Sequence, residues 1–270
     1  MTVAAPDPAS TRPPPPGAAR LFLAMLWRDL LMMSRRLPSA VAQTLVQPFF
    51  LLLVLGTVLT ELGYLRPDHA QVLLPGIVAL ASFLGAAQAT ALNMVFEFQI
   101  TRELDDRLLA PGPTSVVALA KMTFGALRGL LSGLVTLPFG GLLLSVGWEW
   151  AALPLLAGLL VLASAAGAAA GMVLGTVVPP DRISVAFAVA VVPMTFTGST
   201  QFPLPLLGDF PAFQVVCALN PLTYASESLR AVTAPTVPHL PLPVSVVVLA
   251  ACAVLAGWAG VRGFRRRALQ

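Results

Sequence analysis

Apolar residues in this chain run in long blocks, and the polar and charged residues gather in the short stretches between them. A helix needs about 20 residues to cross the ~30 Å hydrocarbon core of a bilayer. Six blocks approach or exceed that length, so we predict spans at residues 40–60, 71–96, 114–146, 151–178, 183–201 and 243–262. Pro138 in the third block and Pro193 in the fifth predict kinks. The pattern therefore predicts an all-α integral membrane protein with six transmembrane helices.

The segment before the first block, residues 18–37, has the pattern of an amphipathic helix. Its apolar side carries Leu21, Met25, Leu26, Leu30 and Met33. Charged residues interrupt the pattern at Arg28, Asp29, Arg35 and Arg36. We interpret it as a helix lying in the membrane interface that ends before Pro38. The alternative is a first span cut short by charge, which is disfavoured because each central charge costs about 2.5–3.5 kcal/mol.

Residues 202–234 are apolar, but prolines divide them into pieces shorter than a span. The prolines are Pro203, Pro205, Pro211 and Pro221. We predict two short re-entrant helices that dip into the outer leaflet. Such helices are allowed only where protein covers their backbone polar groups.

Composition agrees with a membrane protein and excludes an ordinary soluble domain. Hydrophobic residues make up 57% of the 270 residues, charged residues only 10%, and the mean hydropathy is +0.85. Soluble domains carry about a quarter charged residues. A sequence pI near 9.8 does not indicate a nucleic-acid partner here, because in a membrane protein the position of the charges matters more. Residues 1–17, rich in proline and small residues, predict a disordered tail, and residues 18–270 a single membrane domain.

The positive charges predict the orientation of the spans. Of the sixteen lysines and arginines, all but Arg66 and Arg230 fall on one side of the predicted topology. Loops rich in lysine and arginine face the cytoplasm. Both termini are therefore expected in the cytoplasm.

Two glycine ladders occur in the third and fourth blocks. Their members, spaced by four, are Gly125, Gly129 and Gly133 in one block and Gly167, Gly171 and Gly175 in the other. Such stripes let membrane helices approach closely. The alternative is a composition bias in a chain rich in alanine and glycine.

The sequence offers no candidate catalytic centre or metal site. Its one lysine, Lys121, is not part of a phosphate-binding GxxxxGK motif, and His69 and His239 lack metal-ligand spacing. Cys217 and Cys252 cannot form a disulfide framework and are most simply free thiols, with a single bridge as the less favoured alternative. We therefore expect no enzyme activity and no cofactor bound by this chain itself.

Charge inside the spans is also sparse. Ion-coupled transport usually needs carboxylates deep in the bilayer, and none is expected there. Arg128 is the one charge that the pattern places clearly inside a span. We interpret it as structural, either extending to the interface or pairing with Glu97.

The charged residues concentrate instead in residues 97–112, between the second and third blocks. Candidate docking residues there are Glu97, Thr101, Arg102, Glu103, Leu104, Asp105, Asp106, Arg107 and Leu108. Threonine can cap a short helix, the leucines give it an apolar side, and the following Pro-Gly-Pro ends it. We predict a segment that docks on a soluble partner. The alternative is a plain solvated loop.

Two motifs in order on this topology resemble a known family. They are "ITRELDDRLLAPGPTSVVALAK" after the second block and "LNPLTYASESLRA", from Leu219 to Ala231, before the last. The chain resembles the permease subunits of type-2 ATP-binding-cassette exporters, especially the bacterial drug-resistance branch. It departs from some members in its short external loops, which leave no large external domain.

The resemblance implies a partner and an assembly. Residues 97–109 would include the coupling helix, which seats on a separate ATPase subunit that holds ATP and Mg²⁺. Residues 18–37 would be the elbow helix, and the re-entrant pair would cap the path on the outside. Two copies, or this subunit with a related permease, would form the pathway in the bacterial cytoplasmic membrane, among its lipids.

The candidate substrate path lies on the first and fifth blocks, which the resemblance places across the subunit interface. Its residues are Gln43, Gln47, Phe50, Thr195, Phe196, Thr197, Ser199, Thr200 and Gln201. An apolar wall with a few hydroxyls suits a drug, secondary metabolite or lipid-like molecule. Hydrogen bonding between helices explains the hydroxyls equally well. Alternatives for the whole chain are a permease for a lipid-linked glycan or other envelope component, and a non-transporting scaffold or channel.

Overall fold

The structure is a computed structural model that describes residues 17–35, 37–64, 69–96, 114–146, 150–179 and 182–267. Over these residues the regular structure is entirely helical, which confirms the predicted all-α class. The elements are α1 (Ala18–Arg35), α2 (Leu37–Leu51), a π-helical segment (Leu52–Val58), α3 (Leu59–Glu61), α4 (His69–Phe96), α6 (Thr114–Leu144), α7 (Leu153–Val177), α8 (Ile183–Thr197), α9 (Pro211–Ala218), α10 (Pro221–Thr233) and α11 (Leu242–Arg267). Short 3₁₀ turns at Trp150–Ala152 and Leu204–Leu207 complete the described elements.

Four of the described helices are long and apolar enough to cross a membrane. They are α4, α6, α7 and α11, and they coincide with the second, third, fourth and sixth predicted spans. The other two predicted spans correspond to the shorter apolar helices Leu45–Glu61 and Val185–Thr197. Helix α8 stops at Gly198 because the chain turns there, with Ser199 in the left-handed region at φ 49°. The count of six spans therefore remains a prediction.

Helix α4 is the centre of the bundle. It packs along α6 on one side and α7 on another, and α10 covers part of its length. Its side chains are buried nearly throughout, among them Ile77 and Phe83 with no exposed surface. A helix that is apolar all round is expected in such a central position.

The two glycine ladders explain how α4 is held so closely. On α6, a Cβ at Gly129 would overlap the backbone oxygen of Ser82 in α4. On α7, a Cβ at Gly167 would overlap the backbone oxygen of Phe83, also in α4. Both ladders thus face the same helix, which confirms that they serve close packing. In lipid such contacts must drive association, because apolar side chains gain little by leaving lipid for protein.

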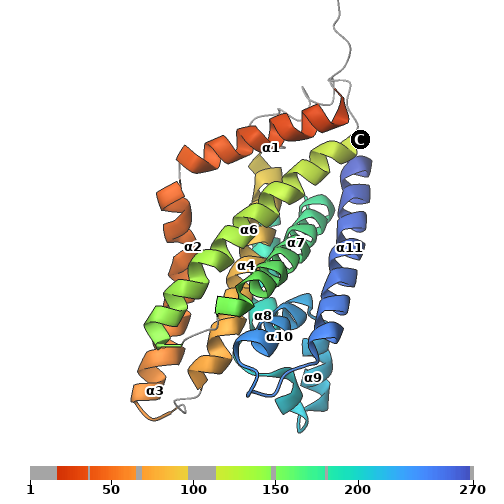
Figure 1. Cartoon of the computed structure of the whole chain (residues 1–270). Coiled ribbons are helices and arrows are strands. Elements are labelled where there is room, and N and C mark those ends of the chain that lie inside the picture. The colour runs from red at the N-terminus through yellow and green to blue at the C-terminus, as the bar shows by residue number, and fades with distance from the viewer. Residues whose placement is uncertain are drawn as a thin grey trace, which may run out of the picture.

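The elements separate toward two ends of the bundle (Figure 1). Helix α1 lies across one end, where α6 begins and α11 finishes. Helices α3 and α9 lie at the opposite end, α3 below α2 and α9 close to the loop that precedes α11. Helices α2 and α11 lie on opposite flanks. The segments predicted as interfacial and re-entrant are therefore helical and lie at opposite ends of the bundle.

Substitution in the α7 ladder should separate packing from helix propensity. Gly167→Val should lower the free energy of unfolding by about 1–3 kcal/mol, because the new side chain must push α7 away from α4. Gly158→Val in the same helix is the matched control, since a Cβ there meets nothing within 4 Å. Unfolding of the purified protein in an SDS titration measures both. Equal losses in the two variants would show that the close approach of α7 to α4 contributes nothing.

Candidate functional site

The second matching motif folds into the start of α10 and fastens it to α8. Asn220 caps the helix, its side-chain oxygen accepting from the Leu222 N–H at 3.0 Å, and Pro221 fills the first turn. The Asn220 amide also donates to the Met194 carbonyl and to the Thr197 hydroxyl, both at 2.9 Å. One asparagine therefore starts α10 and fixes it against the last turn of α8.

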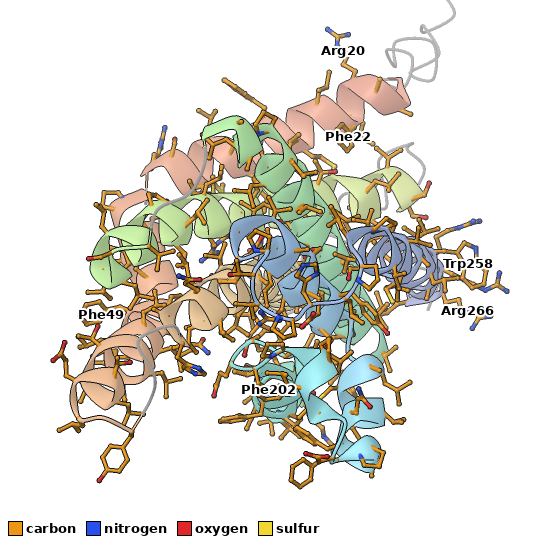
Figure 2. All side chains as sticks on the ribbon, turned by 60° about the horizontal axis from the view of Figure 1, so that its bottom comes forward. Arg20, Phe22, Phe49, Phe202, Trp258 and Arg266 are labelled. Carbon is orange, nitrogen blue, oxygen red and sulfur yellow. The ribbon has the colours of Figure 1, made fainter. Side chains whose placement is uncertain are left out.

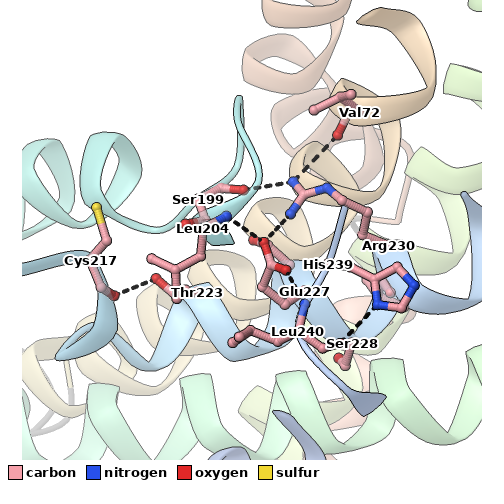
Figure 3. A network of polar contacts seen from close by, with 12 residues as sticks. Val72, Ser199, Leu204, Cys217, Thr223, Glu227, Ser228, Arg230, His239 and Leu240 are labelled. Atoms are coloured by element: carbon pink, nitrogen blue, oxygen red, sulfur yellow. Dashed lines mark hydrogen bonds and ion pairs between the residues drawn. The ribbon is translucent and has the colours of Figure 1, made fainter. Parts of the chain in front are cut away.

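A buried ion pair between Glu227 and Arg230 lies in the middle of α10 (Figure 3). Both side chains have no exposed surface. The Glu227 carboxylate also accepts hydrogen bonds from two backbone N–H groups, that of Leu204 at 3.0 Å and that of Leu240 at 2.8 Å. A buried charge is tolerated only when it is paired and its remaining lone pairs are satisfied, as here.

Arg230 extends the network to two further segments. Its Nη2 donates to the Ser199 carbonyl at 2.7 Å and to the Val72 carbonyl of α4 at 3.4 Å (Figure 3). The pair thus joins α10 to α4, to the loop after α8 and to the loop before α11. We name Glu227, Arg230 and these backbone partners the α10 network. The charge pattern had placed Arg230 among the outer-side charges, and the structure shows it buried because Glu227 stands one helical turn away.

A second buried ion pair joins α1 to α6. Lys121 Nζ donates to Asp29 Oδ2 at 2.7 Å, with 3% and 7% of the two side chains exposed. Arg28 contacts the other carboxylate oxygen, with its Nη2 at 3.1 Å from Asp29 Oδ1. The expectation that Arg128 is the one charge clearly inside a span stays a prediction. Lys121 lies within α6 and is buried there because Asp29 supplies its counter-charge.

This pair explains why charge interrupts the amphipathic pattern of α1. Asp29 and Met25 face the bundle, whereas Leu23 and Trp27 lie on the exposed side at 62% and 65%. An interfacial helix needs an apolar face for lipid. The polar residue toward the bundle instead binds a specific partner on α6.

Breaking the pair from one side should release α1. Asp29→Asn removes the carboxylate charge that binds the buried Lys121 ammonium at 2.7 Å, and we expect a loss of about 1–3 kcal/mol in unfolding free energy. Arg35→Gln is the control, because Arg35 is exposed in the same helix. Limited proteolysis between α1 and α2 reports local release of the helix. Equal protease resistance in Asp29→Asn and the control would contradict the tether.

The hydroxyls of the predicted path are mostly engaged within the chain. Thr195 donates to the Val191 carbonyl at 2.8 Å, and Thr200 donates to the Thr195 carbonyl at 3.1 Å. Thr197 donates to the Pro193 carbonyl and accepts from Asn220. Such bonds favour the structural alternative for these three hydroxyls.

Ser199 is the exception among the buried members of the predicted path. Its side-chain oxygen has no hydrogen-bond partner, although its carbonyl binds Arg230. Gln201 is half-buried in the loop that follows.

The apolar members of the predicted path point away from the core. Phe50 of α2 is 57% exposed, Phe196 of α8 is 58% exposed, and Gln47 is also exposed. Gln43 lies in α2, outside the side chains that the structure describes. Helix α2 packs on α6 and α4, whereas α8 packs on α4, α7 and α10. The structure thus leaves both outward faces without a partner helix in the described part of one chain.

The predicted docking segment, residues 97–112, lies outside the described residues. Its two ends are defined: α4 finishes at Phe96 and α6 begins at Thr114. These two helices, which flank the segment along the chain, pack along each other.

Comparison with known proteins gives a family and a set of relatives. The family model described as ABC-2 type transporter matches residues 20–233, which is most of the chain. The inner membrane transport permease YadH of Escherichia coli K12 is 28% identical over 166 residues, covering 60% of this chain and 62% of that protein. The protein of the same name in Shigella flexneri matches to the same extent. The alignment thus spans under two thirds of these relatives, and no solved structure matches significantly. On the family match, the chain belongs to the ABC-2 type transporter family.

Proposed function

We propose that this chain is the membrane-spanning permease subunit of an ATP-driven exporter in a bacterial cytoplasmic membrane. The observation that carries the proposal is the family match across residues 20–233. The name of its relative, an inner membrane transport permease, supports the same location and role. ATP and Mg²⁺ would be held by a separate ATPase subunit, on which residues 97–112 dock. Both termini would face the cytoplasm, as the positive charges indicate.

The bundle supplies a route for movement from the docking segment into the membrane. Residues 97–112 join α4 to α6, and the glycine ladder holds these helices so closely that they must move together. The Asp29–Lys121 pair adds α1 to the same unit. A push from the ATPase on the docking segment would thus shift α1, α4 and α6 as one body, together with α7, which the second ladder holds on α4 in the same way.

The α10 network would hold the outer end together and join it to α4. It fixes the loop after α8, the loop before α11 and α10 itself onto α4. Helix α9 is added by hydrogen bonds from Thr223 to the Cys217 carbonyl at 2.6 Å and from Tyr224 to the Ala218 carbonyl at 2.8 Å. The segment predicted to cap the path would therefore act as one piece.

The exposed faces of α2 and α8 support assembly of two permease copies around one path. Phe50 and Phe196 are large, apolar and more than half exposed. In a two-copy assembly the α2 face of one chain would meet the α8 face of the other. The substrate would then meet an apolar wall, which suits a hydrophobic or amphipathic compound.

Cross-linking tests this assembly. Phe50→Cys in one tagged copy and Phe196→Cys in a second, differently tagged copy should form a disulfide-linked dimer on mild oxidation. Both copies carry alanine at Cys217 and Cys252. Val247→Cys on α11, exposed at 67%, replaces either partner as the control and should give no dimer. Cross-links through α11 with none between α2 and α8 would reverse the arrangement.

Substrate-stimulated ATP hydrolysis tests the transport role. The chain is co-expressed with an ATPase encoded beside it, and the complex is reconstituted and assayed with a panel of amphipathic drugs, lipids and lipid-linked glycans. Amphipathic drugs are expected to raise the rate of ATP hydrolysis several-fold. Stimulation by the glycans alone would favour an envelope-component permease. A complex that no member of the panel affects would count against export of amphipathic compounds.

A further inference from the structure

The C-terminal end of α11 has an inward and an outward face, and its contacts with α7 identify the inward one. Phe264 is 1% exposed, and a Cβ at Gly260 would stand 2.7 Å from Met172 Cγ of α7. Arg267 Nη1 donates to the Gly175 and Val178 carbonyls at 2.9 and 3.0 Å. These carbonyls belong to the last turn of α7 and to the residue that caps it, and they would otherwise lack helical partners. The inward face of α11 therefore packs mainly on α7, with α6 and α10 also in contact.

The opposite face carries an apolar residue, an aromatic residue and arginines in that order. Val254 and Trp258 are 70% and 64% exposed, and the Arg262 guanidinium lies 5.5 Å from the centroid of the Trp258 ring. Arg266 follows one turn later and, like Arg265, is exposed. Residues four apart lie above one another on a helix, so Val254, Trp258, Arg262 and Arg266 form one stripe. Figure 2 shows Trp258 and Arg266 on the outer flank of α11, directed away from the bundle.

The order of these side chains along α11 matches the order of the acyl, interfacial and phosphate layers in a lipid leaflet. Apolar side chains suit the acyl region, tryptophan prefers the interface, and arginine reaches the phosphate level. Of the four candidate spans, α11 is the least buried inside the chain, so this flank is open to lipid. A soluble anionic partner would have no use for the apolar part of the stripe.

The arginines of the stripe carry a charge that nothing described in the chain neutralises. The ion pairs in the described part of the chain involve Asp29 and Glu227, and neither contacts Arg262, Arg265 or Arg266. Like charges four residues apart on a helix repel each other. Guanidinium groups bind phosphate oxygens through paired hydrogen bonds, so a phosphate between Arg262 and Arg266 would relieve that repulsion.

We propose that the stripe Val254, Trp258, Arg262 and Arg266 binds one anionic phospholipid. The lipid phosphate lies between the two arginines, the glycerol region lies beside Trp258, and an acyl chain follows Val254. Arg267 takes no part, because it is bound to α7. The site is independent of the transported substrate and of any ATPase, so its failure would leave the proposed function untouched.

Quenching of Trp258 fluorescence by brominated lipids tests the site. Phenylalanine replaces Trp27, Trp148 and Trp150, which leaves Trp258 as the reporter in the full chain. Vesicles contain a brominated lipid diluted in unbrominated phosphatidylcholine. Brominated phosphatidylglycerol should displace phosphatidylcholine from the Trp258 site about 25-fold better than brominated phosphatidylcholine does, about fivefold for each arginine. Arg262→Gln with Arg266→Gln should bring that ratio close to one, since each arginine near an anionic surface contributes about a fivefold preference.

Arg20→Gln with Arg35→Gln is the control, because it removes equal charge from exposed positions on α1. This pair should leave the ratio at Trp258 unchanged. Two results would overturn the site: equal quenching by the two lipids in the reporter protein, or an equal fall in the ratio for the α1 control. Gel filtration and circular dichroism establish that each variant is folded. As a second measurement, 0.5 M NaCl should lower the ratio without changing quenching by phosphatidylcholine.

Discussion

Glu227→Ala is expected to destabilise this protein by about 3–5 kcal/mol, because it leaves the Arg230 charge buried without a counter-ion. It also removes the acceptor for the Leu204 and Leu240 N–H groups, which lie in two different loops. The loss should therefore reach the whole outer end of the bundle. Ser245→Ala is the matched control, because this buried hydroxyl has no hydrogen-bond partner and its removal should cost little.

The thiol of Cys217 gives a direct reading of that loss. It is free and has no exposed surface, and it lies in α9, which the α10 helix holds in place. In a Cys252→Ala background, maleimide labelling of Cys217 should be at least 100-fold faster in Glu227→Ala. This follows because each 1.4 kcal/mol changes the open population about tenfold. A labelling rate equal to that of Ser245→Ala would refute a supporting role for the network.

An uncharged replacement of Glu227 and Arg230 separates the effect of their charges from the effect of their packing. Glu227→Gln alone keeps an oxygen for the backbone donors but leaves Arg230 unpaired. Adding Arg230→Met removes the stranded charge, and the double variant should be more stable than Glu227→Gln alone. Breaking one partner of a buried pair costs more than replacing both. A double variant that is less stable than the single one would show that the bonds of Arg230 to Ser199 and Val72 outweigh its charge.

The second large effect is expected in the predicted docking segment. Glu103→Lys with Asp106→Lys should abolish export and substrate-stimulated ATP hydrolysis while leaving the protein level in the membrane unchanged. The segment is expected outside the lipid, so insertion does not depend on its charges. Leu104→Ala or Leu108→Ala should weaken retention of the ATPase by about 1–3 kcal/mol if either leucine is a central anchor.

Reversal of the same number of charges elsewhere is the control for this prediction. Glu61→Lys with Asp209→Lys changes two exposed acidic residues at the other end of the bundle. Export by that variant should match the parent protein. Normal export and normal ATPase binding by the Glu103 and Asp106 variant would identify the segment as a solvated loop.

Span length was readable from the sequence because the bilayer itself sets it. The predicted span at 71–96 is the helix His69–Phe96, and that at 114–146 is Thr114–Leu144. The glycine ladders predicted close packing, but spacing along one helix cannot reveal the neighbour. Only the structure shows that both ladders face α4. Helix α8 ends at Thr197, before the predicted end at residue 201, because the chain turns at Gly198 and Ser199 adopts a left-handed backbone conformation.

The polar supports were harder to predict, because they depend on distant pairing. Asp29 and Lys121 are 92 positions apart, and the sequence around either residue does not predict the contact between them. Glu227 and Arg230 did carry a local signal, a carboxylate one turn before an arginine in a short helix. A count of lysines and arginines on each side of the membrane does not show that Arg230 has a carboxylate partner. For the candidate path, threonine hydroxyls cannot be assigned from sequence, since each can bond the backbone of its own helix.

Affinity purification of the tagged chain from its native membrane tests the central claim most directly. Quantitative mass spectrometry of the purified material measures which proteins are bound and in what ratio. One ATPase subunit with a phosphate-binding loop is expected for each copy of this chain. The Glu103 and Asp106 reversal is expected to remove the ATPase while the chain itself is recovered in full. Recovery of the chain with no ATPase, from membranes in which that ATPase is abundant, would contradict the account.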